Sequence, residues 1–507
     1  MAVARNVIAN GIGTVAFIGA TAATSIFAFR IAGPEQFGLI GFYLTLHGIV
    51  AVLDIGLGPG IVREVARARA GGKAVGIGTI LYTFQGIFLG LTGLTTTLLL
   101  AASWLLARLI TADTIPADEI HLALILTAFT IGAQRLRSVF TIFLEGMEQQ
   151  VTANILQSGG AVIRAGVAIG AMIAVRPSAV VFLAASLAVC ALEVVVNALT
   201  AWRAVPRGSE KAYFSVPLIR ELAHFLATSS TSGMLGALLQ NADKLVVSTL
   251  LPLDVTGRYL FISQVCLIVV KLVVPNVTAV LPRLSASVHR GDLADTRRVY
   301  FAAGQTAACL VGVFVFGATF FGNEALSILT GSHAVADDYA RTFTLLAWAY
   351  GLNSLCYLPN ALLLAEGHPE TAFWSNAIAT VAYLPSLFTL TLSLGVEAPA
   401  FLWLVTNAMI LTVFLGRAHF HGLKGQRGAW LRSSLVPQFA VAGLMLYATR
   451  MLLGPTIALP LLAAAVIAAS GAALGVAALV GPDLREAVFG LLRRRIGPRP
   501  ASADQTA

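Results

Sequence analysis

The sequence predicts an all-α polytopic membrane protein with about fourteen transmembrane helices, arranged as two pseudo-symmetric six-helix lobes around a central cavity plus two C-terminal helices. Hydrophobic residues make up 57% of the 507 residues, charged residues make up 11%, and the mean hydropathy is +0.84. Apolar runs of about 20 residues, the length that crosses the hydrocarbon core of a bilayer, recur along the chain. The chain also contains an internal repeat. A water-soluble protein of this length does not have such a composition, so lipid is the predicted solvent.

The repeat is visible in two pairs of short segments. IAGPEQFG at 31–38 returns 219 positions later as LLPLDVTG, so that Glu35 and Gly38 correspond to Asp254 and Gly257. At nearly the same offset, LEG at 144–146 matches AEG at 365–367. Both matches lie between apolar runs, which indicates that a bundle of helices was duplicated. Two related bundles that face each other across a bilayer are typical of transporters, whose central site is reached from alternate sides.

The first lobe is predicted over residues 1–205. The first apolar run follows Arg5 directly and is too long for a secretory signal, so we expect an uncleaved helix. Residues 206–225 form a predicted cytoplasmic linker, in which the amphipathic segment Val216–Leu226 lies along the inner membrane interface. The six apolar runs of this lobe are 6–31, 37–58, 75–107, 117–143, 150–175 and 178–201.

The second lobe is predicted over residues 226–420. Two Ala- and Leu-rich spans at 433–453 and 456–481 lie outside the duplication, so residues 421–484 form peripheral helices, and a basic cytoplasmic tail follows at 485–507. The runs of the second lobe are 226–250, 256–283, 300–321, 341–365, 371–395 and 398–416.

The orientation follows from the basic residues. If the N-terminus is cytoplasmic, 22 of the 33 Lys and Arg fall on the inside, six fall on the outside and five lie within spans. This bias follows the positive-inside rule. The basic loops fall on the same side of the membrane along the whole chain only if the number of spans is even. Both termini are therefore predicted to be cytoplasmic. Topology and attraction to anionic lipid explain the net charge of +9, so no nucleic-acid partner is implied.

Several classes of function are disfavoured. The longest outward loop, Gly322–Tyr339, leaves no room for the catalytic domain of a membrane enzyme, and the sequence has no GxxxxGK[ST] phosphate loop. The four cysteines lie inside spans without paired spacing, so neither a disulfide framework nor a metal site is implied. We expect a protein that is not an enzyme and has no cofactor.

Two segments resemble a known family. Residues 5–70, from RNVIANGIGTVAF through IAGPEQFG to VREVARARA, look like the N-terminal signature of bacterial polysaccharide transporters, the oligosaccharide-lipid flippases of the multidrug/oligosaccharidyl-lipid/polysaccharide superfamily. NADKLVVSTLLPLDVTGRY at 241–259 is similar to the start of that family's second half. The resemblance spans about residues 5–420. It implies a V-shaped pair of lobes that flips undecaprenyl-pyrophosphate-linked sugar units to the outer leaflet, for exopolysaccharide or O-antigen export.

Ionisable residues within spans are the candidate site residues, because a charge in the middle of a span costs about 2.5–3.5 kcal/mol on insertion scales. Arg164 and Lys271 lie near the centres of their spans, and both are predicted to hold the pyrophosphate. Lys244 and Arg30 are further candidates for the same role. For all four, pairing with acids or anchoring at the interface is the structural alternative.

Acidic residues are candidates for ion coupling or for cavity ion pairs, namely Asp54, Asp243 and Glu193. Through the repeat, Lys271 corresponds to a position two residues before Asp54, which suggests an Asp54–Lys271 contact. Arg135 and Arg137 lie two apart, so they face different sides of their helix, and at least one is expected to reach the membrane interface.

Alternative functions stay open at this point. They include a lipid-linked peptidoglycan precursor flippase, a multidrug exporter of the same superfamily, an assembly scaffold, and a membrane enzyme of polysaccharide assembly. The expected partners are a lipid-linked oligosaccharide, membrane lipid, and polymerase or other assembly proteins. The sequence does not determine the sugar, the length of the carrier lipid, the coupling ion or the oligomeric state.

Overall fold

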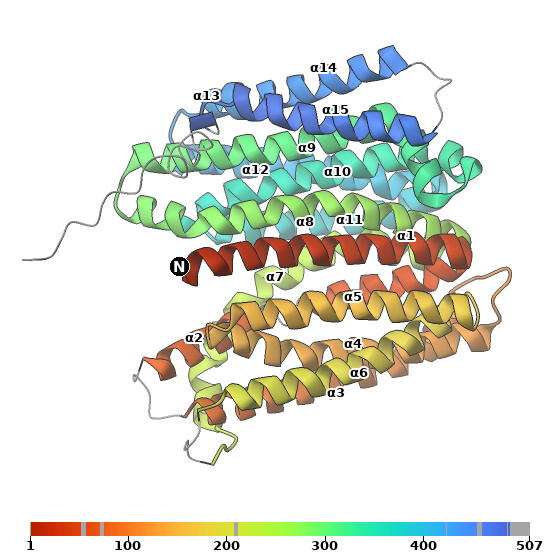
Figure 1. Cartoon of the computed structure of the whole chain (residues 1–507), viewed down its shortest axis with the longest axis vertical. Coiled ribbons are helices and arrows are strands. Elements are labelled where there is room, and N and C mark those ends of the chain that lie inside the picture. Colours follow the sequence, from red (N-terminus) through yellow and green to blue (C-terminus); the bar gives the residue numbers. More distant parts are fainter. Residues whose placement is uncertain are drawn as a thin grey trace, which may run out of the picture. The chain divides into compact units, whose positions relative to one another are not determined.

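The described part of the chain is helical, with turns between the helices (Figure 1). This confirms the predicted all-α class. Ten of the described helices are long and apolar enough to cross a membrane. The computed structural model describes residues 2–51, 57–70, 76–206, 211–421, 423–453, 459–483 and 485–486.

The helices follow the predicted order of apolar runs. Their bounds are α1 (Ala2–Ala51), α2 (Leu57–Arg69), α3 (Ile77–Leu109), α4 (Ala117–Gly146), α5 (Gln150–Ala174), α6 (Ala179–Ala204), α7 (Val216–Leu250), α8 (Leu253–His289), α9 (Leu293–Thr330), α10 (His333–Ala365), α11 (Glu370–Leu394), α12 (Glu397–His421), α13 (Arg427–Trp430), the π-helix η2 (Leu431–Leu435), α14 (Val436–Leu453) and α15 (Leu459–Val480).

Helix α1 contains the first predicted span and the second one as far as Ala51. Gly33 has φ 80° and ψ 173°, a conformation that is not helical and that glycine adopts without steric cost. Pro34 follows, and its fixed φ suits the first turn of a new helix. The boundary predicted between residues 31 and 37 therefore coincides with a real break in the helix.

Large apolar side chains are exposed on many helices. Val175, Val381 and Leu452 are 75%, 76% and 85% exposed. In water such surfaces would mark sites of association, whereas in a bilayer they face hydrocarbon chains. This distribution agrees with a multi-pass membrane protein.

The chain divides into two compact units. The first consists of Met1–Ile268, Leu329–Val335 and Asn376–Trp403, and the second of Val269–Ile328, Ala336–Ser375 and Leu404–Ala507. The division falls within α8 rather than at the predicted linker 206–225. The lobe boundaries at residues 205 and 226 therefore stay predictions.

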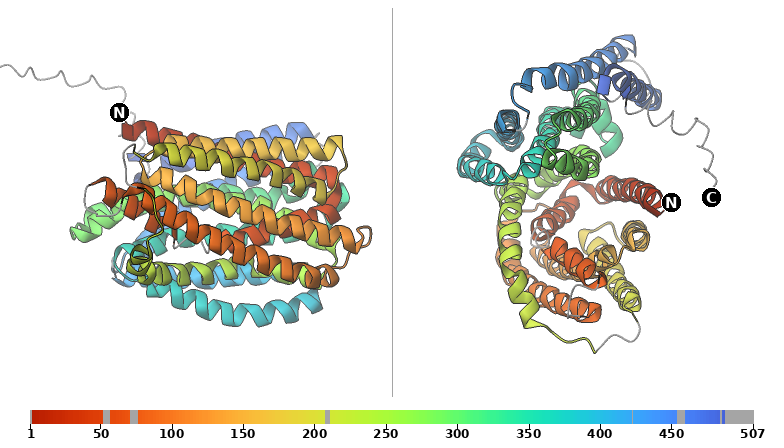
Figure 2. Two further views of the ribbon diagram at one scale, coloured as in Figure 1. Left: turned by 90° about the horizontal axis from the view of Figure 1, so that it is seen from below. Right: turned by 90° about the vertical axis from the view of Figure 1, so that its left-hand side faces the viewer.

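In the first unit, α3, α4 and α6 pack side by side, and α5 packs against α6 and α1 (Figures 1 and 2). A core between α2, α3, α4 and α7 includes Ile61, Phe84, Phe143 and Leu218, each at most 2% exposed. Leu218 belongs to the segment predicted to lie along the interface, yet α7 runs without a break from Val216. Within this segment Leu218 packs into the core, whereas Val216 is 55% exposed. The position of the segment along the membrane interface stays a prediction.

The repeat-related glycines contact each other within the first unit. A Cβ on Gly257 would lie 1.8 Å from the Pro34 carbonyl oxygen and 2.9 Å from the Gly38 nitrogen, and a Cβ on Gly38 would lie 2.7 Å from the Leu253 oxygen. Beside them, the ring of Phe261 on α8 stacks on that of Phe29 on α1, with centroids 4.3 Å apart. The matched turns of the duplication therefore pack backbone to backbone.

In the second unit, α14 and α15 pack along one another (Figure 1). Phe321 of α9, Leu446 and Leu462 form a buried cluster, and Arg450 pairs with Glu324. The predicted outward loop 322–339 is mostly helical, because α9 continues to Thr330 and α10 begins at His333. Both helices thus extend past their apolar runs, and the outward position of this connection stays a prediction.

We predict that Gly257→Ala destabilises the protein. The added methyl would meet backbone atoms, which cannot move aside like a side chain, and overpacking of this kind costs about 1–3 kcal/mol or more. The apparent melting temperature of the detergent-solubilised protein measures the effect. Gly93→Ala on α3 is the matched control, because no heavy atom lies within 4 Å of its added Cβ. Equal melting temperatures for the two variants would contradict the packing described here.

Candidate functional site

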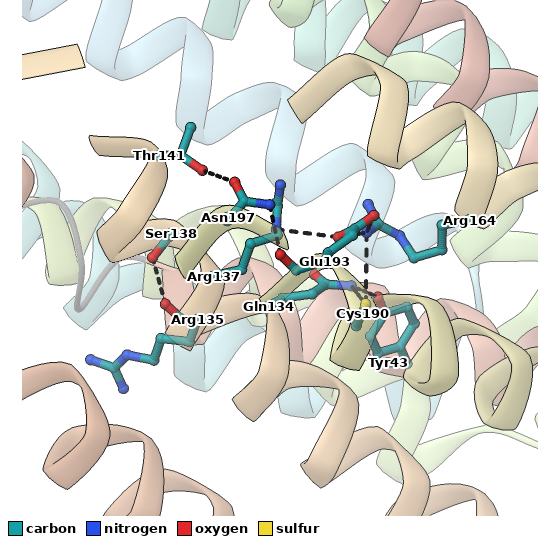
Figure 3. A network of polar contacts seen from close by, with 10 residues as sticks. All are labelled: Tyr43, Gln134, Arg135, Arg137, Ser138, Thr141, Arg164, Cys190, Glu193 and Asn197. Carbon is teal, nitrogen blue, oxygen red and sulfur yellow. Dashed lines mark hydrogen bonds and ion pairs between the residues drawn. The ribbon is translucent and has the colours of Figure 1, made fainter. Parts of the chain in front are cut away.

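A ladder of polar side chains joins α4 to α6 inside the first unit (Figure 3). Each helix contributes residues spaced i, i+3 and i+7, which lie on one face of a helix. Each rung joins residues 56 positions apart, so the two helices run parallel and in register. The rungs are Gln134 Nε2 to Cys190 Sγ at 3.7 Å, Arg137 Nε to Glu193 Oε2 at 3.3 Å, and Thr141 Oγ1 to Asn197 Oδ1 at 3.2 Å.

Two neighbouring helices extend the ladder. From α5, Arg164 Nη1 donates to both carboxylate oxygens of Glu193, at 2.8 and 2.7 Å, and contacts Cys190 Sγ at 3.7 Å. From α1, Tyr43 accepts a hydrogen bond from Gln134 Nε2. Four helices of the first unit therefore meet at one polar cluster near the middle of α5 and α6.

Glu193 is shared between two guanidinium groups. The side chains of Glu193, Arg137 and Arg164 are 8%, 13% and 17% exposed, so solvent screens them weakly. The two arginines also repel one another. One carboxylate between two arginines leaves one positive charge in excess, which favours an anionic ligand.

Arg137 has N–H groups that donate no hydrogen bond to the described residues. Among the described residues, its Nε and Nη1 are buried without a hydrogen-bond partner, although the ion pair with Glu193 holds the side chain in place. A guanidinium presents donors in a planar fork that matches the oxygens of a phosphate or a carboxylate. The unused donors of Arg137 are therefore suited to the oxygens of a phosphate group.

The structure places the other predicted residues separately. Lys244 and Asp243 are buried on α7, with Nζ 3.3 Å from Oδ1, and Asp243 also accepts a hydrogen bond from Tyr259 at 2.7 Å. Arg30 is exposed, and its Nε donates to the Leu329 carbonyl at 3.0 Å.

Two predicted residues cannot be joined to the cluster. Lys271 is half-buried on α8 and belongs to the second unit, whereas Arg164 belongs to the first. Asp54 lies outside the described residues. The Asp54–Lys271 contact stays a prediction.

Arg137 was not among the predicted site residues. The expectation that Arg135 or Arg137 reaches the interface is wrong, because Arg135 is 3% exposed and the Arg137 side chain is 13% exposed. Arg135 contacts Thr95 on α3, with Nη1 3.5 Å from Oγ1. Two arginines on different faces of α4 can both be buried because helices pack on both sides of it. The matched i, i+3, i+7 polar pattern in the fourth and sixth spans was the signal for Arg137.

Comparisons with known proteins agree with this architecture. The family described as Polysaccharide biosynthesis protein matches residues 3–288. A putative O-antigen transporter of Shigella flexneri is 22% identical over 407 residues, which covers 76% of this chain and 91% of the relative. The sequence match extends past the matched family region into the rest of the chain.

Solved structures share the fold. The lipid II flippase MurJ in an inward closed conformation has a TM-score of 0.70 at 12% identity, and the match covers 96% of this chain and 99% of that one. An inward-facing multidrug resistance MATE family transporter of the MOP superfamily has a TM-score of 0.64 at 15% identity, with 85% and 99% covered. At these identities the likeness concerns the fold.

We predict that Arg164 and Glu193 are energetically coupled. Glu193→Leu leaves Arg137 and Arg164 without their shared carboxylate, and breaking a buried pair in this way costs about 3–5 kcal/mol. Arg164→Leu should cost less, because Glu193 keeps its ion pair with Arg137. The double variant should lose less stability than the sum, with a coupling of about 1–3 kcal/mol. Melting temperatures of the three purified variants test this.

Arg176→Ala is the control for this cycle. Arg176 pairs with Glu119, but its side chain is 58% exposed. Surface pairs contribute about 0–1 kcal/mol, so this variant should melt close to the wild type. Strict additivity of the two single losses would show that Arg164 and Glu193 do not interact in the folded protein.

Proposed function

We propose that this chain, which belongs to the Polysaccharide biosynthesis protein family, is a secondary transporter that flips undecaprenyl-pyrophosphate-linked oligosaccharide units across the cytoplasmic membrane. The observation that carries the proposal is the polar ladder, in which Arg137 and Arg164 share one carboxylate inside a bundle of apolar helices. The name of the Shigella flexneri relative, a putative O-antigen transporter, supports export of O-antigen units. Export of exopolysaccharide units is the other form of the same proposal.

The chemistry of the cluster fits the charged end of such a substrate. A diphosphate carries negative charge and several acceptor oxygens, and charge-assisted hydrogen bonds to it contribute about 1.5–3 kcal/mol each. The sugars require polar surroundings, whereas the polyprenyl tail is compatible with lipid. In this proposal Arg164 and Arg137 bind the diphosphate during translocation.

The remaining candidates have secondary roles in the proposal. Lys271, Lys244 and Arg30 contact the substrate at other stages of its passage, and Asp54 and Asp243 are candidates for ion coupling. The Asp243–Lys244 pair also stabilises α7 against α8 through Tyr259. The proposed orientation has both termini in the cytoplasm, as the distribution of Lys and Arg indicates.

A lipid-linked peptidoglycan precursor is the second candidate substrate. Its carrier has the same diphosphate, and the structure of lipid II flippase MurJ shares the fold of this chain. A cation exporter is disfavoured, because the excess charge of the ladder is positive. A polymerising enzyme is also disfavoured, since the family and the similar solved structures carry transport and biosynthesis descriptions rather than a catalytic one.

Reconstitution tests the proposal. The purified chain is placed in liposomes with labelled undecaprenyl-pyrophosphate oligosaccharide, and an outside sugar-modifying enzyme reports its exposure. Protein-dependent exposure of intact lipid-linked sugar supports flipping. Transfer or polymerisation of the sugar would instead identify an enzyme. A parallel assay with lipid II distinguishes the two candidate substrates.

We predict that Arg164→Ala and Arg137→Ala each lower the flipping rate by about tenfold to a hundredfold, since each removes charge-assisted bonds of about 1.5–3 kcal/mol. Arg176→Ala should flip at the wild-type rate, because its exposed side chain lies outside the ladder. Rates are compared at equal amounts of inserted protein. Wild-type flipping by both ladder variants and by the double variant would refute the diphosphate assignment.

A further inference from the structure

We infer that Glu193 is an internal counter-anion, which occupies the two arginines in the absence of substrate and is replaced by the substrate's diphosphate. The inference rests on the proposed function, because it assigns the regulation of the same site. It makes Glu193 a competitor of the substrate instead of a fixed structural partner of Arg164.

The contacts of Glu193 resemble those of a bound anion. Both of its carboxylate oxygens accept from Arg164 Nη1, and Oε2 lies 3.3 Å from Arg137 Nε. A phosphate placed between the two arginines would take Nη1 of Arg164 and Nε of Arg137 from the carboxylate, because guanidinium groups bind carboxylates and phosphates with the same N–H donors. Two ligands that need the same donors exclude one another.

The backbone around Glu193 is held while its side chain alone makes the ion pairs. Asn197 Nδ2 donates to the Glu193 carbonyl oxygen at 2.7 Å, and Asn197 is in turn bonded to Thr141 at 3.2 Å. Rotation of the glutamate side chain can therefore release the arginines without a change in α6. Electrostatic repulsion explains why an anion occupies the site in the absence of substrate. Two arginines that repel each other are costly at low dielectric when no anion lies between them.

A glycine on the neighbouring helix makes room for this carboxylate. A Cβ on Gly160 of α5 would lie 2.6 Å from Glu193 Oε1 and 3.0 Å from Cδ, whereas a Cβ on Gly159 would have no heavy atom within 4 Å. The obstructing atoms are the flexible end of the glutamate, so an alanine at 160 would displace the carboxylate and leave the helix intact. The adjacent glycines thus provide a displacing variant and its matched control.

A resident anion tunes both binding and release. Diphosphate has to displace Glu193, so its net affinity is lower than that of two bare arginines. The return of the carboxylate then competes with the diphosphate and speeds release. A transport site requires both properties, because a ligand that is bound too tightly does not leave.

Binding of farnesyl diphosphate to the purified full-length chain in detergent tests the inference. Glu193→Gln keeps the shape and removes the charge, so the Kd should fall about tenfold or more relative to the wild type. Gly160→Ala should lower the Kd severalfold, and Gly159→Ala should bind like the wild type. Arg164→Ala should weaken binding in every background.

Flipping kinetics give a second readout. For Glu193→Gln and Gly160→Ala, both KM and kcat for lipid-linked oligosaccharide should fall, because the substrate binds more tightly and leaves more slowly. A purely structural ion pair predicts weaker binding instead. Gly160→Ala retains the carboxylate, so it remains informative if Glu193→Gln does not fold.

The outcomes separate the inference from the proposed function. Unchanged or weaker binding by Glu193→Gln and Gly160→Ala, together with loss of binding in Arg164→Ala, would overturn the counter-anion and leave the diphosphate site in place. Absence of diphosphate binding in the wild type and in all variants would overturn both.

Discussion

The carboxylate of Glu193 compensates two guanidinium groups within helices whose outer faces are apolar, and the polar contacts of α1, α4, α5 and α6 are arranged around that compensation. A buried charge without a partner is costly at low dielectric, so Arg137 and Arg164 constrain every helix that contacts them. The ladder between α4 and α6 keeps these helices parallel and in register. This compensation is incomplete, since two positive charges share one negative charge. The excess positive charge is the basis of the proposed binding of an anionic group.

Most of the fold could be predicted from the sequence because the bilayer imposes a single length scale on apolar runs. The helices follow the expected spans, and the break at Gly33 lies where the first two were separated. Helix ends were less predictable, since α9 and α10 continue as helices beyond their apolar runs. The continuity of the amphipathic segment with the seventh span was not expected, and the burial of Leu218 depends on tertiary packing that an amphipathic pattern does not reveal.

The candidate site was predicted only in part. Mid-span position identified Arg164 and Glu193 as unusual one at a time, but it did not show that one binds the other, because their pairing depends on how α5 and α6 are rotated. Arg137 was not predicted as a site residue. Because Arg135 lies on another face of α4, at least one of the two arginines was expected to reach the membrane interface. The side-chain direction of a buried arginine depends on the helices around it, and only the matched polar spacing in two spans carried that information.

The contact between Gly38 and Gly257 joins equivalent positions of the two repeats. An interface in which both sides contribute the same patch is isologous, the form found in twofold homodimers. A chain with one repeat would offer this patch to a second copy of itself, so duplication and fusion convert an encounter between molecules into a permanent intramolecular one. The same contact also constrains which residues can replace either glycine. A side chain at Gly38 would meet Leu253, and a side chain at Gly257 would meet the equivalent residue of the other repeat, Pro34. Each repeat therefore limits the size of the residue at the glycine position of the other.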